Sequence, residues 1–272
     1  MLALPHIGYG PAMGELTKTP APMWATWMDR FNRWASRDLG GGPRPFPLAW
    51  WINVQKVGTA PFVFALMVAY DNFSVAAWVY LALHGTYGLC WLLKHLIFPD
   101  PGWDELVTLL GGVNSWVFVL GLYWVAPFLL ISDVLGADRF QPSLPLIAAA
   151  ISLHTLGVVV MMAADTQKYF VLKVQRGLIE DGWIKRVRHI NSTGEMMLYS
   201  AYALMVGHWI PWVILLWVWG GLFLTNMLMK EQSLSRYPGW AAYKRRSGML
   251  LPKIFAKSST ATHVEPSQAA GR

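Results

Sequence analysis

Five long stretches of this 272-residue sequence carry no charged side chain. They cover residues 57–70, 72–93, 106–132, 140–164 and 196–229. A helix needs about 20 predominantly apolar residues to cross a bilayer, and the last stretch is long enough for two crossings, with His208 and Pro211 marking a turn near its middle. The sequence therefore predicts an all-α, polytopic integral membrane bundle of about six transmembrane helices, near 49–70, 73–93, 106–132, 143–165, 191–208 and 210–229.

The composition favours a membrane protein over a soluble one. Charged residues make up 14% of the chain and hydrophobic residues 55%, whereas a soluble domain carries about 25% charged residues. The 16 Trp, 12 Phe and 10 Tyr are typical of a protein with two membrane–water interfaces, where such rings accumulate. A secreted disulfide scaffold and a disordered chain are excluded. The single cysteine, Cys90, leaves no cysteine-based metal site, and we expect no metal.

The positive charges are distributed unevenly around the predicted helices. Twenty-one of the 22 Lys and Arg residues fall on one side of a six-helix topology, and only Arg139 falls on the other. Because cytoplasmic loops hold the excess of Lys and Arg, this predicts that both termini and the basic loops are cytoplasmic. The same asymmetry accounts for the net charge of +7 without a nucleic-acid partner. A basic cytoplasmic side suits membrane lipid or an anionic ligand.

Three regions follow from these patterns. Residues 1–48 are rich in Pro and Gly and form a cytoplasmic or interfacial segment, in which Met23–Trp34 has apolar residues at helical spacing and is predicted to lie in the membrane interface. Residues 49–257 form the transmembrane domain with its cytoplasmic loops. Residues 258–272 are polar and are predicted to be a disordered tail. The proline- and glycine-rich start of the chain argues against a cleaved signal peptide.

Polar side chains inside the predicted helices are candidates for function, because they are costly to bury in a bilayer. Those near the cytoplasmic ends of the helices are expected to share a pocket open to the cytoplasm: Asn53, Gln55, Lys56, Asp165, Asn191, Glu195 and Asn226. For His154 and Asn114 we favour a structural hydrogen bond to a neighbouring helix. Tyr87 lies about 9 Å inside the boundary of the second helix, at a rise of 1.5 Å per residue. It could either hydrogen-bond the backbone or polarise a ligand carbonyl.

Lys and Arg residues alternate with aromatic residues in the segment from 165 to 195 and in the tail. Cations suit phosphate groups and rings suit stacking, so these segments predict a nucleotide-cofactor site, although a patch facing lipid headgroups has the same composition. The candidate cofactor-binding residues are Asp165, Lys168, Tyr169, Lys173, Arg188, His189, Asn191, Glu195, Lys230, Glu231, Tyr237, Tyr243, Arg245 and Arg246.

The spacing of several of these residues carries a family resemblance. Arg188-His189-x-Asn191-x-x-Gly194-Glu195 opens the fifth predicted helix, and the tail contains Tyr237-Pro-x-Trp-x-x-Tyr243-x-x-Arg246 followed by Leu-Leu-Pro252. Over about residues 49–255 the chain resembles the steroid 5α-reductase C-terminal and DUF1295 family of membrane reductases. The wider clan of that family includes sterol reductases and isoprenylcysteine carboxyl methyltransferases.

The resemblance implies an all-helical membrane enzyme that takes NADPH from the cytoplasm and reduces a C=C bond conjugated to a carbonyl in a lipophilic substrate. It implies that Asp165 faces the adenosine end of the cofactor. Asn191 and Glu195 lie by the nicotinamide and the pocket, and Tyr87 donates a hydrogen bond to the substrate ketone.

The sequence departs from the family pattern at several points. Ile190 and Ser192 replace a proline and an aromatic residue, and the chain has six predicted helices where steroid 5α-reductases have seven. The family's Gln-Glu pair falls on Asn53 and Val54. Asn53 and Gln55 remain the catalytic candidates of that helix beside Tyr87 and Glu195. Either Gln55 and Lys56 substitute for the missing carboxylate, or the reaction differs.

Three functions compete at this point. The leading one is an NADPH-dependent ene-reductase. The second is an S-adenosylmethionine-dependent methyltransferase of the isoprenylcysteine type, against which the absence of Arg-His-Pro-x-Tyr and the presence of Glu195 argue. The third is a non-catalytic membrane lipid-binding protein, favoured by the missing carboxylate.

Overall fold

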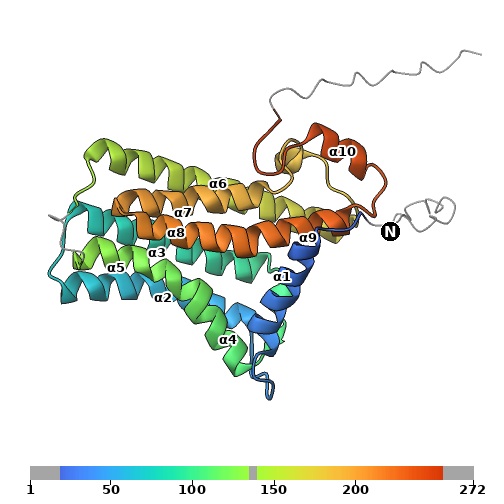
Figure 1. The fold of residues 1–272 in the computed structure, drawn as a ribbon. Coiled ribbons are helices and arrows are strands. Elements are labelled where there is room, and N and C mark those ends of the chain that lie inside the picture. The colour runs from blue at the N-terminus through green and yellow to red at the C-terminus, as the bar shows by residue number, and fades with distance from the viewer. Residues whose placement is uncertain (1–18, 135–139, 254–272) are drawn as a thin grey trace, which may run out of the picture.

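The computed structural model describes residues 19–134 and 140–253 as an all-α bundle (Figure 1). Its helices are α1 (Met23–Arg33), α2 (Leu48–Ala69), α3 (Val75–Ile97), α4 (Leu109–Ser115), α5 (Val125–Ser132), α6 (Leu144–Val174), α7 (Ile190–Val206), α8 (Trp209–Val218), α9 (Leu224–Leu234) and α10 (Trp240–Arg246). Short 3-10 and π segments link some of them: η1 (Trp34–Asp38), η2 (Pro101–Trp103), η3 (Trp116–Leu120), η4 (Gly121–Trp124), η5 (Gly182–Ile184) and η6 (Trp219–Phe223). Strand β1 (Phe46–Pro47) pairs antiparallel with β2 (Leu106–Val107).

Five helices of the described chain are long and apolar enough to cross a membrane. They are α2, α3, the continuous run Leu109–Ser132 from α4 to α5, α6, and the run Trp209–Leu234 from α8 to α9. The predicted crossing at 191–208 is α7, which is a helix of only 17 residues and does not belong to those five. A break at Gly207, with positive φ, and His208 separates α7 from α8, so the predicted turn is confirmed.

Helix α6 differs most from its predicted boundaries. It continues to Val174, nine residues beyond the predicted end at 165. Asp165, Lys168, Tyr169 and Lys173 therefore belong to a helix, and the prediction that 166–174 is loop is wrong. The physical reason is that Lys and Tyr do not break a helix. A charge ends the apolar stretch without ending the helix, and no Gly or Pro intervenes before Gly177.

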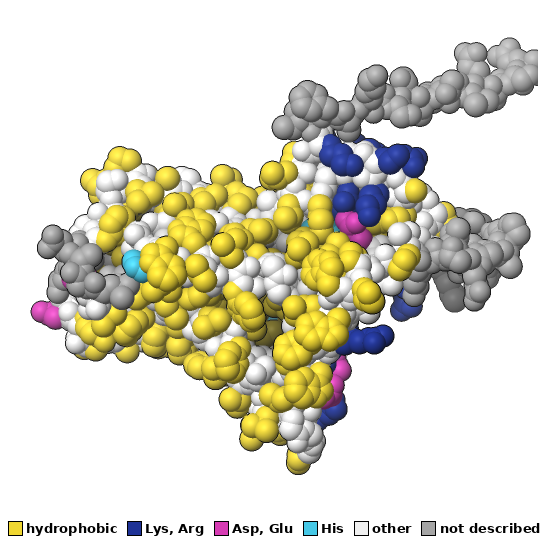
Figure 2. Space-filling view, in the orientation of Figure 1, with side chains coloured by type: hydrophobic (Ala, Val, Ile, Leu, Met, Phe, Trp, Pro, Cys, Tyr) yellow, Lys and Arg dark blue, Asp and Glu magenta, His cyan; other side chains and the backbone are white. Residues whose placement is uncertain are grey.

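Charged side chains gather at one end of the bundle (Figure 2). This end, called the charged end below, comprises residues 98–108, 175–189 and 235–253. A backbone hydrogen bond from Arg188 N to Gly248 O at 3.0 Å joins two of its segments, and one from Leu48 N to Glu105 O at 3.0 Å joins the start of α2 to the third. The opposite end and the sides of the bundle are largely apolar in this view, with many exposed hydrophobic side chains, as expected for a surface that contacts lipid.

The first helix forms an arm with the bent α4 segment, at the charged end of the bundle (Figure 1). Asn32 donates to Gly221 O at 3.0 Å, Asn114 donates to Ala35 O at 3.2 Å, and Thr108 N donates to Arg37 O at 2.9 Å. The prediction of a helix over Met23–Trp34 is confirmed, and its apolar residues Met23, Trp24, Trp27, Phe31 and Trp34 are exposed. The structural role predicted for Asn114 is confirmed.

Helices α6 and α7 cross with their backbones in contact. A Cβ atom on Gly194 would lie 2.6 Å from Gly157 O, and one on Gly157 would lie 2.6 Å from Gly194 O. Only glycine fits such an approach, which is common where membrane helices pack closely. The crossing fixes the neighbouring Glu195 relative to α6.

The predicted tail at 258–272 lies outside the described residues, and so do residues 1–18 of the predicted N-terminal segment 1–48. The same holds for Arg139 on the sparsely charged side.

Candidate functional site

One face of α7 leads from the charged end into the core. Asn191, Glu195, Tyr199 and Tyr202 follow one another at intervals of four, four and three residues, so they share a helical face. Each interval of four moves about 6 Å along the helix axis. Tyr199 and Tyr202 are buried, while Asn191 and Glu195 are partly accessible. The polarity therefore changes along this face from amide and carboxylate to phenol.

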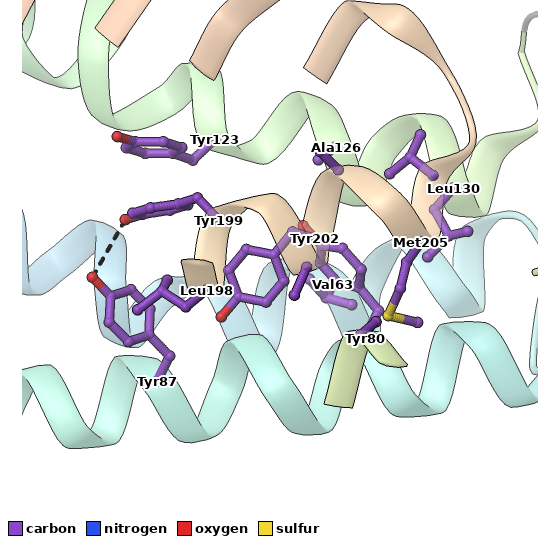
Figure 3. Packing of buried hydrophobic residues seen from close by; sticks show 14 of the residues in the cluster. Val63, Tyr80, Tyr87, Tyr123, Ala126, Leu130, Leu198, Tyr199, Tyr202 and Met205 are labelled. Atoms are coloured by element: carbon purple, nitrogen blue, oxygen red, sulfur yellow. Dashed lines mark hydrogen bonds between the residues drawn. The ribbon is translucent and has the colours of Figure 1, made fainter. Parts of the chain in front are cut away.

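Helix α3 presents a matching face of buried residues to α7: Tyr80, His84, Tyr87, Trp91 and Lys94. The hydroxyl groups of Tyr87 and Tyr199 point toward one another (Figure 3) and lie 3.5 Å apart. Tyr199 also stacks on Tyr123 of η4, with ring centroids 4.2 Å apart. The prediction that Tyr87 occupies a pocket position inside its helix remains compatible with this geometry, but its oxygen meets another tyrosine rather than a backbone carbonyl.

Lys56 on α2 supplies the positive charge in the middle of these rings. Its ammonium group lies 4.9 to 5.2 Å from the ring centroids of Tyr87, Trp91, Tyr123 and Tyr199, and it donates a hydrogen bond to the Tyr199 hydroxyl. The side chain is buried, and among the described residues it has no carboxylate within ion-pair distance. We call Lys56 and these four rings the lysine cage.

The position of Lys56 depends on a second close helix contact. A Cβ atom on Gly88 would lie 2.2 Å from Lys56 O, so α2 and α3 touch at this point. Gln55, by contrast, is fully buried and bonds within its own helix to Thr59 at 3.5 Å. Asn53 lies one turn before Lys56 and has a buried Oδ1 atom without a hydrogen-bond partner. Of the two residues expected to substitute for the missing carboxylate, Lys56 contacts the tyrosines, whereas Gln55 bonds within its own helix and, like Asn53, has a buried side-chain oxygen without a hydrogen-bond partner among the described residues.

Toward the charged end, ionisable groups replace the tyrosines. Lys94 of α3 pairs with Asp165 of α6, and both side chains are largely buried. Glu195 interacts electrostatically with Lys94, Asp165, Lys56 and Lys230, yet it forms no hydrogen bond or ion pair within the described part of the chain. Lys230 of α9 and Lys168 of α6 repel each other, and neither has an ion-pair partner in the described ranges. Two unpaired cations and one unpaired carboxylate therefore meet here.

A small cavity of about 20 Å³ lies on the other side of Tyr199. It is lined by Tyr80, Tyr123, Tyr199 and Tyr202 and closed by Pro211 and Leu215 of α8. This space holds about one water molecule. Tyr202 is fixed in its wall by His154, whose Nε2 lies 2.9 Å from the Tyr202 oxygen, which confirms the structural bond expected for His154.

A second cluster of predicted cofactor residues is occupied by internal contacts. Glu231 accepts from Arg188 at 2.7 Å and lies 2.9 Å from Lys244, and Arg188 donates to Ser247 O at 2.6 Å. Arg246 pairs with Glu180, and Tyr243 donates to Ile184 O at 2.7 Å. We call these residues the docking cluster, because they hold the segment from α10 to Lys253 against residues 184–189.

Burial sets the protonation of two groups in the docking cluster. It lowers the pKa of His189 below its usual value, with Glu231 acting in the opposite direction, so this imidazole is neutral at pH 7. Its Nε2 lies 3.7 Å from a Glu231 oxygen, too far for a hydrogen bond. Burial likewise raises the pKa of Tyr243 to about 12, so its hydroxyl remains a donor.

The predicted site residues thus separate into groups. Tyr87, Asp165, Lys168, Asn191, Glu195 and Lys230 belong to the faces that surround the lysine cage and the ionisable groups above it. Arg188, His189, Glu231, Tyr243 and Arg246 belong to the docking cluster. Lys173 lies over the ring of Tyr169 at 4.5 Å near the end of α6, and Tyr237 stacks under Arg236 at 5.0 Å. Arg245 is exposed on α10.

Sequence reasoning missed Tyr199, Tyr123, Trp91 and Lys94. Tyr199 follows Glu195 by one helical turn, and this spacing could have drawn attention to it. Lys94 was counted only as a loop cation, because the predicted helix ended at 93. No pattern in the sequence predicts that Tyr123 stacks on Tyr199.

No protein-family model and no curated protein matches the chain. The functional assignment therefore depends on the geometry of its own residues. Among the described residues, no group of three His, Cys, Asp or Glu side chains is placed to hold a metal ion.

Proposed function

We propose that the protein is a membrane-embedded, NADPH-dependent reductase of a C=C bond conjugated to a carbonyl, acting on a steroid, sterol or other lipophilic substrate. One observation carries this proposal: Glu195 interacts electrostatically both with Lys230, which in turn interacts with Lys168, and with the tyrosines of the lysine cage, and none of Lys168, Lys230 and Glu195 forms an ion pair in the described chain. Anion-binding groups and proton donors thus follow one another along the α7 face. The resemblance of the Arg188 to Glu195 motif to membrane reductases supports the same chemistry.

The donor set suits a dinucleotide phosphate. Phosphate groups bind cations, and neither Lys168 nor Lys230 forms an ion pair in the described chain, although the carboxylates of Asp100, Asp165 and Glu195 act on Lys230 from farther away. The free carboxylate of Glu195 and the amide of Asn191 suit a carboxamide and ribose hydroxyls. Lys168 and Lys230 would hold the phosphates, Asn191 and Glu195 the nicotinamide end. When bound, NADPH supplies a hydride to the substrate carbon.

The remaining roles fall to groups of the protein. A tyrosine hydroxyl of the lysine cage polarises the substrate carbonyl and stabilises negative charge on its oxygen. The buried rings around Lys56 exclude water, which strengthens these interactions. A lipophilic substrate reaches them from the bilayer rather than from water. The cavity beside Tyr199 marks the start of its path, and it must widen by displacement of α8 to admit more than a water-sized molecule.

We further propose six crossings, with the charged end in the cytoplasm. The uneven distribution of Lys and Arg supports this orientation, and α7, with 17 residues, reaches the lower end of the range for a crossing, about 17–25 residues. Reporter domains fused after Gln141 and after Arg272 are expected to lie on opposite sides of the membrane. Reporters on the same side would overturn the six-crossing topology.

Ligand-induced stabilisation of the purified protein tests the cofactor assignment. NADPH is expected to raise the melting temperature, and S-adenosylmethionine is not. Replacing Lys168 and Lys230 together by Ala is expected to weaken NADPH binding at least about tenfold, since hydrogen bonds to charged groups contribute about 1.5–3 kcal/mol each. The effect should shrink at high salt, where charge interactions are screened.

The charge-matched control is Lys185→Ala with Arg186→Ala, two exposed cations outside the site, which should leave NADPH affinity unchanged. Equal losses of NADPH affinity in both double variants would indicate that Lys168 and Lys230 belong to a general surface for lipid or anions. Stabilisation by S-adenosylmethionine alone would favour the methyltransferase, and stabilisation by neither ligand would favour a non-catalytic lipid-binding protein.

A further inference from the structure

We propose that Tyr199, with Lys56 hydrogen-bonded to its hydroxyl, donates the proton in the reduction, and that Tyr87 positions Tyr199 without contacting the substrate. This assignment rests on the proposed function and deepens it. It departs from the expectation raised by the family resemblance, which gave the hydrogen bond to the ketone to Tyr87.

The position of the cavity distinguishes the two tyrosines. Tyr199 and its stacking partner Tyr123 line the cavity, and Tyr87 does not. In Figure 3 the Tyr199 and Tyr123 hydroxyls point away from Leu130, and hence toward the charged end where the cofactor site is proposed. The Tyr87 ring lies edge-on to Tyr199 at 5.8 Å, on the α3 side. A ligand in this cavity therefore touches Tyr199, together with Tyr80, Tyr123 and Tyr202, but not Tyr87.

Lys56 makes Tyr199 suited to give up its proton. The ammonium group donates directly to the phenol oxygen, and an adjacent positive charge stabilises the phenolate that remains after proton transfer. No carboxylate within ion-pair distance neutralises this lysine in the described part of the chain, so its charge is balanced by ring faces and the phenol oxygen. Tyr87 has no cation bonded to its oxygen. Among the described residues its hydroxyl meets only that of Tyr199, at 3.5 Å.

Every element packed against this pair contributes charged or titratable groups. The described neighbours that interact with Lys56, Tyr87 or Tyr199 are His84 and Lys94 from α3, Tyr123 from η4, Asp165 from α6, and Glu195 and Tyr202 from α7. Lys94 and Asp165 neutralise each other as an ion pair. Glu195 is then the remaining carboxylate on the side of the cage that faces the charged end.

The proposed step balances as follows for an enone substrate. The C=C bond accepts a hydride at its β-carbon from the proposed cofactor, and its electron pair shifts to the carbonyl oxygen. The Tyr199 O–H bond breaks and its proton passes to that oxygen, giving an enol that tautomerises to the saturated ketone. The Tyr199 phenolate regains a proton from the Lys56 ammonium. Water at the charged end then reprotonates the Lys56 amine.

The test compares purified full-length wild type with Tyr199→Phe, Tyr87→Phe and Lys56→Met, using a Δ4-3-ketosteroid and an alkyl-substituted cyclohexenone as probes. Tyr199→Phe is expected to lower kcat by about 10²–10⁴-fold, the usual contribution of a general acid, while stabilisation by NADPH is retained. Tyr87→Phe is expected to lower kcat much less than Tyr199→Phe does, because the Tyr87 hydroxyl acts only through Tyr199. Lys56→Met is expected to lower kcat and to move the high-pH limb of its profile upward by about one to three pH units, because the charge that stabilises the phenolate is lost.

The outcomes separate the two claims. Turnover by wild type together with near-wild-type kcat for Tyr199→Phe, or an unmoved pH profile for Lys56→Met, overturns the assignment of Tyr199 and leaves the reductase function standing. A larger loss of kcat in Tyr87→Phe than in Tyr199→Phe would indicate that Tyr87 is the proton donor. Absence of NADPH-dependent turnover of both probes by wild type overturns the proposed function and this assignment with it.

Discussion

Glu195→Gln is expected to weaken NADPH binding about 10- to 100-fold while the melting temperature of the unliganded protein changes little. Gln keeps the shape and one acceptor oxygen but loses the charge, and a hydrogen bond to a charged group contributes about 1.5–3 kcal/mol. Glu195 forms no hydrogen bond or ion pair with another described side chain, so its replacement breaks neither and removes only longer-range charge interactions. Ligand titration followed by fluorescence or calorimetry measures the affinity, and thermal unfolding measures the stability.

The structure excludes a structural role for Glu195 at the N-terminus of α7. A carboxylate in the first turn of a helix is stabilised by the helix dipole, but α7 begins at Ile190 and has no acidic residue in its first turn. Glu195 is the sixth residue of α7, beyond the range of that effect. Asn191→Ala, in the first turn on the same face, is the companion variant. Full NADPH affinity in both variants would refute the proposed cofactor site.

The matched control for Glu195→Gln is Glu105→Gln. Glu105 is also at the charged end, and its carboxylate is 48% exposed and lies 2.5 Å from Arg37. This substitution changes the net charge equally but lies away from the α7 face. It should leave NADPH affinity unaltered, so a similar loss in Glu105→Gln would mean that overall charge, not the site, governs binding.

Glu231→Gln is expected to destabilise the protein by about 3–5 kcal/mol, the usual cost of breaking a buried ion pair by removing one partner. The side chains of Arg188 and Glu231 are 6% and 8% exposed, so the Arg188 charge would remain buried without its carboxylate. Lys244 is half exposed and adds little. The measurement is thermal unfolding combined with limited proteolysis, which should cut the segment from α10 to Lys253 sooner in the variant.

Glu180→Gln is the control for the docking cluster. Its pair with Arg246 is 31% and 47% exposed, and exposed pairs contribute about 0–1 kcal/mol. The two Glu→Gln variants should therefore differ clearly in stability and in protease sensitivity. Equal effects would show that the C-terminal segment is not held by the buried Arg188–Glu231 pair.

The sequence predicted the architecture well because charge-free length is a local property. The stretches without Asp, Glu, Lys or Arg coincide with α2, α3, the Leu109–Ser132 run, α6 and the α7 to α9 region, and the break at His208 was correctly expected. The predicted end of α6 at residue 165 was wrong, because a helix that emerges from a membrane continues through charged residues until a helix-breaking residue such as Gly177. Local patterns do not contain that information.

The site was predicted only in part, because its decisive contacts join residues far apart in the sequence. Lys56 and Tyr199 are 143 residues apart, and no spacing rule connects them. Arg188, Arg246 and Glu231 were interpreted as cofactor-binding residues because basic residues beside rings suit phosphates. The same composition also suits an internal ion-pair network. Only the geometry distinguishes the paired cations from the unpaired Lys168 and Lys230.

The close contact between Gly157 and Gly194 holds α6 and α7 together as one rigid pair of helices. The two helices form the most extensively packed pair in the described chain, whereas α8 makes far fewer contacts with α7, α5 and η4. We therefore expect α8 to move when a bulky hydrophobic molecule enters the cavity beside Tyr199. Glu195 on α7 should then keep its position relative to Asp165 on α6. Displacement of α8 would thus open the cavity toward the lipid while the packing of α6 on α7, which aligns the polar groups, is retained.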